Sequence, residues 1–108
     1  KGSLFENLIL NEFIKRSYNR GENRQPYYWQ DNHGKEIDCL LVNGEKVAAV
    51  EIKSGKTIST SYFENLIYWR SMTALPENQV YVVYGGEQSM QTSAGTLISW
   101  KDLDRIPD

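Results

Sequence analysis

A chain of 108 residues with 40% hydrophobic and 12% aromatic residues can bury one core and is too apolar for a disordered tail. Its formal net charge of −2 excludes the basic excess with which non-specific nucleic-acid binders neutralise phosphates, so any contact with DNA must be local or be supplied by a partner. No apolar run approaches the roughly 18 residues of a membrane span, and no apolar stretch behind a positively charged start suggests a signal peptide.

The single cysteine and the first residue of the chain bear on where the protein works. Cys39 cannot form an internal disulfide, which fits a reducing compartment, and we expect a cytoplasmic protein. The chain starts at Lys1 without a methionine. We therefore expect a single domain over residues 1–108 that is a fragment of a larger protein.

The first half of the chain is predicted to form one helix and three strands. Apolar residues at helical spacing, behind a capping box, predict a helix over 3–16. An aromatic run predicts a strand over 27–29. Asn43-Gly44, the strongest short-range signal for a two-residue hairpin turn, joins predicted strands over 36–42 and 45–53.

The second half is predicted to form a helix and two more strands. A capping box at its start and apolar residues behind it predict a helix over 61–73, and Pro76 blocks its continuation. Strands are expected over 79–84 and 96–100. The order α-β-β-β-α-β-β places a crossover helix between two strands, which implies a parallel pair in a mixed sheet. The predicted fold class is α/β, with a mixed central sheet flanked by helices.

The hairpin brings charged residues to one face of the predicted sheet. A two-residue loop at 43–44 places Asp38 opposite Ala49, and Glu51 becomes the diagonal neighbour of Asp38, roughly 7–8 Å away. Because side chains two apart on a strand point the same way, Lys53 joins that face. Two acids and a lysine on one face predict a divalent-metal site with a cation beside it.

This element order, with Asp38 on one strand and Glu51-Ile52-Lys53 on the next, resembles the PD-(D/E)XK nuclease superfamily. The resemblance implies a restriction-endonuclease-like three-layer core. The local sequence is similar to the C-terminal domain appended to many prokaryotic AAA+ ATPases, which implies that the parent chain contains an ATPase module. Three segments carry this narrower resemblance: Gly2-Ser3-Leu4-Phe5-Glu6-Asn7-Leu8, Gly34-Lys35-Glu36-Ile37-Asp38 and Val50-Glu51-Ile52-Lys53-Ser54-Gly55.

The resemblance also implies a role for each residue of the motif. Asp38, Glu51 and the backbone carbonyl of Ile52 would be metal ligands, Glu6 would be an auxiliary acid near the metal, and Lys53 would be the catalytic lysine. Hard oxygen ligands suit Mg²⁺, with Mn²⁺ as the substitute. The implied activity is Mg²⁺-dependent hydrolysis of DNA phosphodiesters.

Each of these residues also has a simpler interpretation. Glu6 lies three residues after Ser3, so it can serve as the second half of a helix cap. Glu51 and Lys53 can form an ion pair on a solvated face, and Asp38 can be exposed near the start of its strand. Glu36, opposite Glu51 in the predicted register, either adds negative charge to the same pocket or is solvated at the strand end.

Two residues outside the motif are given structural interpretations. His33, the only histidine, lies in a predicted turn and is expected at the surface. Cys39 is expected to be a small core residue.

The sequence leaves more than one function open. An alternative to the nuclease is a catalytically inactive module that uses the same fold to bind protein or nucleic acid, which the acidic net charge favours. A third possibility is a structural domain that supports oligomerisation of the ATPase.

Overall fold

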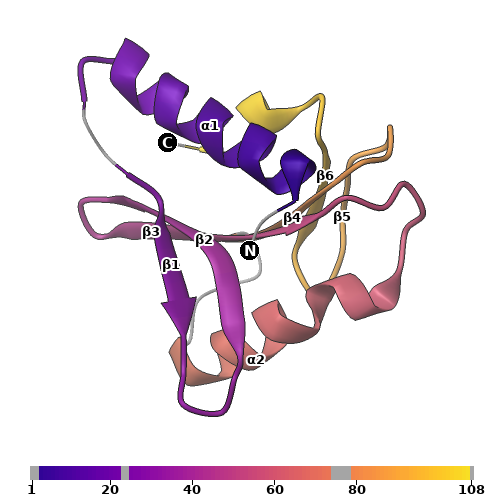
Figure 1. The fold of residues 1–108 in the computed structure, drawn as a ribbon. Helices are drawn as coiled ribbons and strands as arrows, with labels where there is room; N and C mark the ends of the chain where they lie inside the picture. Colours follow the sequence, from indigo (N-terminus) through magenta and orange to yellow (C-terminus); the bar gives the residue numbers. More distant parts are fainter. Residues whose placement is uncertain (1–2, 23–24, 74–78, 108) are drawn as a thin grey trace.

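A computed structural model describes residues 3–22, 25–73 and 79–107, and shows one mixed sheet lying between two helices (Figure 1). The strands are ordered β1-β2-β3-β4-β6-β5, with β3, β4 and β6 parallel and the other neighbours antiparallel. The elements are α1 (Leu4–Asn19), β1 (Tyr27–Gln30), β2 (Glu36–Asn43), β3 (Lys46–Lys53), the 3₁₀ turn η1 (Thr60–Phe63), α2 (Glu64–Thr73), β4 (Val80–Tyr84), β5 (Met90–Gln91), β6 (Thr96–Ser99) and the 3₁₀ turn η3 (Leu103–Arg105). None of the helices in the described ranges is both long and apolar enough to cross a membrane.

Helix α1 begins where the sequence predicts and runs about one turn further. Ser3 caps it, because its Oγ accepts a hydrogen bond from the backbone N–H of Glu6 at 3.0 Å. Ile9, Phe13 and Ser17 are buried at intervals of one helical turn. Ser17 therefore carries the sheet-facing stripe of the helix past its predicted end.

The crossover from β3 to β4 contains a 3₁₀ turn followed by α2, rather than one continuous helix. Ser59 caps the turn, since its Oγ accepts a hydrogen bond from the N–H of Ser61 at 3.3 Å. The capping box expected to begin at Ser61 is therefore wrong, because the helical segment begins before it. Pro76, expected to end this helix, lies outside the described residues.

The hairpin between β2 and β3 turns one residue later than predicted. Gly44-Glu45 forms the loop, and Asn43 remains in β2. Gly44 has a φ of +65°, a conformation that is available to glycine at no steric cost, so glycine takes the first loop position. Ala49 consequently pairs with Leu40, and the predicted pairing of Ala49 with Asp38 is wrong. Because the partner changes by two residues, the paired residues from Cys39 to Asn43 keep the alternation predicted for them. The alternation breaks at Asp38, since Ile37 packs on the α2 side of the sheet and Cys39 on the α1 side.

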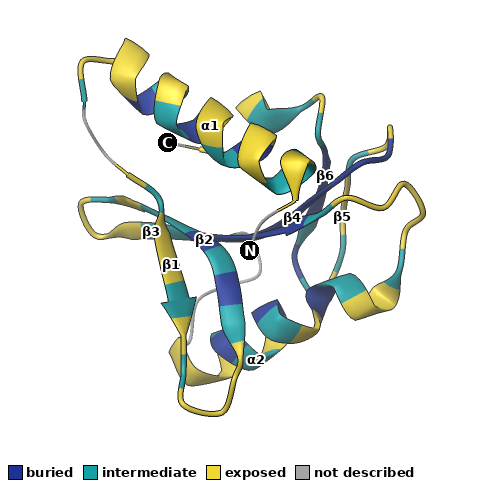
Figure 2. Ribbon diagram, in the orientation of Figure 1, coloured by how far each residue is buried: buried dark blue, intermediate teal, exposed yellow. Residues whose placement is uncertain are grey.

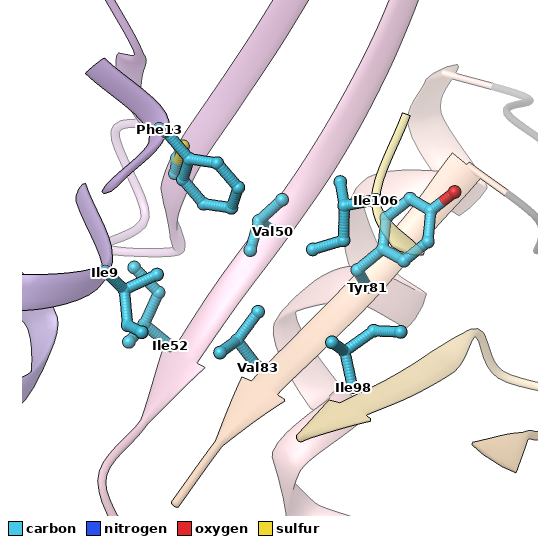
Figure 3. Packing of buried hydrophobic residues seen from close by; sticks show 9 residues of the cluster. Ile9, Phe13, Val50, Ile52, Tyr81, Val83, Ile98 and Ile106 are labelled. Atoms are coloured by element: carbon cyan, nitrogen blue, oxygen red, sulfur yellow. The ribbon is translucent and has the colours of Figure 1, made fainter. Parts of the chain in front are cut away.

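The core lies on both faces of the sheet, with β4 buried along its whole length between them (Figure 2). The cluster between the sheet and α1 (Figure 3) contains Ile9, Phe13, Cys39, Val50, Ile52, Tyr81, Val83, Ile98 and Ile106. The cluster on the α2 side contains Ile37, Ala49, Phe63, Leu66, Trp69, Val80, Val82, Tyr84 and Leu97. Cys39 is a core residue, as expected, and burial raises the pKa of its thiol to about 12.

The predicted α/β class, mixed sheet and flanking helices are confirmed, and the restriction-endonuclease-like core stays a prediction. The order differs by one short strand, β5, which pairs antiparallel with β6. Two exposed residues are too few to show a period-two pattern, so this strand has no signal in the sequence. The last predicted strand ends at Ser99 instead of Trp100.

Two neighbouring residues of α2 test the packing of this helix on the sheet. Leu66 is fully buried and Ile67 is 51% exposed. We expect Leu66→Ala to lower the free energy of unfolding by about 2–5 kcal/mol, because it leaves a cavity against the sheet. Ile67→Ala should change it by only about 0.5 kcal/mol. Denaturant unfolding measures both, and equal losses would show that the face assigned to the core is wrong.

Candidate functional site

A β-bulge in β2 sets the position of Asp38. The register between β1 and β2 shifts between Tyr27 and Trp29, so Tyr28 alone lies opposite both Asp38 and Cys39. Bulges bend a strand and redirect its side chains. Figure 1 shows the β1–β2 hairpin turning away from the parallel part of the sheet beyond this point.

The Asp38 carboxylate replaces a backbone acceptor where β2 and β3 separate. The paired residues of the two strands end at Cys39 and Val50. Beyond that pair, Asp38 Oδ2 accepts a hydrogen bond from the backbone N–H of Ile52 at 2.8 Å. A side chain therefore satisfies a buried donor that a continued ladder would otherwise pair.

Glu51 is a carboxyl group inside the core. It is 1% exposed two residues before the end of β3, and continuing the register by one residue places it against Asp38. Among the described residues its Oε2 has no hydrogen-bond partner. Burial, together with the hydrogen bond and charge of Asp38, raises the pKa of Glu51 to about 8, and Asn65 and Lys53 oppose the shift. The two acids thus act on each other directly.

Lys53 and Glu6 flank the acid pair from different elements. Lys53 is half-buried at the end of β3, two residues beyond Glu51, and its charge lowers the pKa of Glu51. Glu6 is half-buried in the first turn of α1 and lines an open cleft of about 550 Å³ together with Asp38. Glu6 therefore faces the side of the pair nearer α1.

The structure brings together fewer acids than a three-carboxylate metal site requires. Within the described ranges, no three His, Cys, Asp or Glu side chains converge closely enough to hold a metal ion. Asp38 and Glu51 form a pair, and the roles of Glu6 and the Ile52 carbonyl as ligands stay predictions. Mg²⁺ needs only one or two carboxylates, because it keeps several waters. The buried, unpartnered oxygen of Glu51 fits such a two-carboxylate site.

Glu36 and His33 lie away from the acid pair. Glu36 does not face Glu51 as the predicted register required: it pairs with Gln30 of β1 and accepts a hydrogen bond from the Tyr28 hydroxyl. The later turn of the hairpin causes this difference. His33 is exposed beside Asp31, as expected for a turn residue.

Asn65 is a member of the site that the sequence did not single out. It lies on α2, and its side chain interacts with the Glu51 carboxyl. A signal was available, since Asn65 precedes the buried Trp69 by one helical turn and therefore shares the sheet-facing stripe.

Residues 1–103 match the model of a family described as a domain of unknown function, DUF4143. The chain belongs to the DUF4143 family. No curated protein and no solved structure matches it. The matched range includes Glu6, Asp38, Glu51 and Lys53, so the acid pair and both flanking residues lie within the DUF4143 domain.

The stability of this DUF4143 domain should depend on pH through Glu51. Above its ordinary pKa of 4.5, an unfolded chain loses the Glu51 proton, whereas the folded domain keeps it until about pH 8. The contribution of Glu51 to the free energy of unfolding should therefore be fully present below about pH 4.5, fall by up to about 1.4 kcal/mol per pH unit, and level off above pH 8. The total loss of this stabilisation between pH 4.5 and pH 8 is of the order of a few kcal/mol.

The comparison that isolates this effect uses urea unfolding between pH 5 and 9 for the wild type and for Glu51→Gln. The difference in the free energy of unfolding between the wild type and Glu51→Gln should narrow or reverse as the pH rises, because glutamine carries no titrating proton. Glu45→Gln, at an exposed carboxyl in the hairpin loop, should follow the wild type. Parallel curves for the wild type and Glu51→Gln would contradict the raised pKa.

The Asp38–Ile52 hydrogen bond has a local signature. In Asp38→Ala the Ile52 N–H loses its acceptor, so we expect faster amide hydrogen exchange at Ile52 and a loss of about 1–3 kcal/mol in the free energy of unfolding. Asp38→Asn keeps an acceptor oxygen and should retain much of the protection. The amide of Trp100, bonded to the Tyr84 carbonyl at 3.0 Å, is the internal reference. Unchanged exchange at Ile52 relative to Trp100 would rule out this bond.

Proposed function

We propose that this DUF4143 domain is a Mg²⁺-dependent, nuclease-type hydrolase of DNA phosphodiesters that works as part of a larger AAA+ ATPase. The observation that carries the proposal is the acid pair at the point where β2 and β3 separate, with the Glu51 carboxyl buried and one of its oxygens without a hydrogen-bond partner among the described residues. The helix–sheet–helix arrangement supports a restriction-endonuclease-like fold for the same domain.

The chemistry of the acid pair favours a cation as its ligand. Burial first, and the adjacent Asp38 carboxyl second, disfavour the charged form of Glu51, which is why Glu51 holds its proton to about pH 8. A divalent cation compensates both charges, so its binding should displace that proton. Asp38 and Glu51 would hold Mg²⁺ or Mn²⁺, with Glu6 and the Ile52 carbonyl as the further predicted ligands. When bound, the metal lowers the pKa of a coordinated water and neutralises charge on the phosphate.

Each residue of the site has a role that follows from its position. The Ile52 N–H fixes the Asp38 carboxylate, and burial holds Glu51 beside it. Lys53, at the end of β3, would place its ammonium group beside the phosphate, where it stabilises developing charge or orients the attacking water. Preorganised groups of this kind act most strongly where water is excluded.

A second candidate is a catalytically inactive module of the same fold that binds protein or nucleic acid. The observation that favours it is the absence of a third converging acid among the described residues. On this hypothesis Glu51 is a neutral, buried member of a structural pair near pH 7. The two candidates differ in whether the acid pair binds a metal and whether Lys53 matters for activity.

Metal titration by calorimetry, followed by a cleavage assay on single-stranded and duplex DNA, tests the proposal. Glu51→Ala should lose both Mg²⁺ or Mn²⁺ binding and cleavage, because it removes a ligand. Lys53→Ala should keep metal binding and lose cleavage by about 100-fold or more, the usual scale for removing one electrostatic stabiliser. Lys56→Ala, at an exposed lysine in the loop after β3, is the matched control and should resemble the wild type.

The outcomes separate the two candidates. Metal binding that is lost in Glu51→Ala, without cleavage by the wild type, would favour the inactive module. Metal binding that survives Glu51→Ala would remove the acid pair from consideration as the metal site.

A further inference from the structure

The cleft beside the acid pair has a lining that the proposed chemistry does not use. Its volume of about 550 Å³ lies within the range of about 300–1,000 Å³ typical of small-molecule pockets. Leu10 and Ile14 of α1 and Tyr28 of β1 supply apolar and aromatic walls, and Asn7 and Gln25 contribute amides from two different segments. Asp38 opens onto the same space.

We propose that this cleft binds one unstacked nucleobase of a single-stranded nucleic acid, with the base against the ring of Tyr28. The proposal rests on the function proposed above and names its substrate class. The base would lie beside the phosphate that the acid pair and its metal engage.

Tyr28 is suited to serve as a stacking surface. It is 54% exposed, and its hydroxyl donates a hydrogen bond to Glu36, which fixes the ring on the edge strand. Every base presents a flat π-face, so an aromatic ring at this position binds a base without regard to sequence.

The polar groups of the cleft match the edges of a base rather than a phosphate. The amides of Asn7 and Gln25 each offer donors and an acceptor for the edge of a base. None of the described residues that line the cleft is a lysine or arginine. A phosphate would therefore meet no cation inside it, whereas a neutral heteroaromatic ring would meet complementary partners.

A cleft that takes one base also favours one form of nucleic acid. A base in a duplex is paired and stacked, and it reaches a side pocket only if it is flipped out at a cost of a few kcal/mol. A base in a single strand is already free to enter. Single-stranded substrate is therefore the class that the cleft favours.

Fluorescence anisotropy with a labelled ten-residue oligodeoxyadenylate, in EDTA at low salt, tests this proposal without metal or cleavage. The wild type should bind the single strand more tightly than the corresponding duplex. Tyr28→Ala should weaken binding by about five- to 150-fold, the range for removing one base-stacking aromatic, and Tyr28→Phe should retain most of it. Tyr27→Ala is the matched control, because Tyr27 is 61% exposed on the same strand but does not line the cleft.

Adenosine provides a second readout that depends on the base and not on the DNA backbone. Its addition should shift the amide resonances of Asn7 and Gln25 in the wild type and not in Tyr28→Ala. Equal effects of Tyr27→Ala and Tyr28→Ala, equal affinity for single strand and duplex, or no binding by the wild type would each overturn the proposal. Because none of these measurements uses a metal, a negative result would reject base binding and would not bear on metal binding by the acid pair. Base binding without any cleavage would instead reject the hydrolase.

Discussion

The hydrogen bond from the Ile52 N–H to the Asp38 carboxylate is the constraint on which the rest of the site depends. Without it, a buried backbone donor would have no partner at the point where β2 leaves β3. With it, β2 can bulge and turn away while β3 stays in the sheet. The same bond holds one acid at the rim of the cleft and directly against the second acid, Glu51.

The position of Glu51 lowers the stability of the fold and, in the proposed function, supplies a metal ligand. A carboxyl that is 1% exposed in a central strand is disfavoured unless it is neutral or compensated. Asn65 and Lys53 compensate it only in part, since its pKa remains raised to about 8. Conflicts of this kind between a residue and its surroundings are concentrated at functional sites. In this DUF4143 domain the conflict lies beside a cleft of about 550 Å³.

Features that follow from turn signals and periodic patterns could be predicted from the sequence. Features that depend on local backbone geometry, such as the β-bulge, could not. The hairpin signal placed Asp38 and Glu51 on neighbouring strands, although the hairpin turned at Gly44-Glu45 instead of one residue earlier. Helical spacing placed the buried face of α1. The bulge in β2 leaves no pattern in one sequence, so the contact of Asp38 with the Ile52 N–H was not foreseen. The same limit applies to the cleft, which depends on how α1 lies over β1 and β2.

The central claim is that Glu51 keeps a proton beside Asp38 and that a divalent cation bound by both carboxyls can displace it. Carbon-13 NMR of the side-chain carboxyl of Glu51, followed over pH with and without Mg²⁺, measures this most directly. We predict a midpoint near the raised pKa of about 8 in the absence of metal, a lower midpoint in Asp38→Asn, and a clear downward shift when Mg²⁺ is added to the wild type. A midpoint near the ordinary value of 4.5 that neither Asp38→Asn nor Mg²⁺ changes would contradict the account.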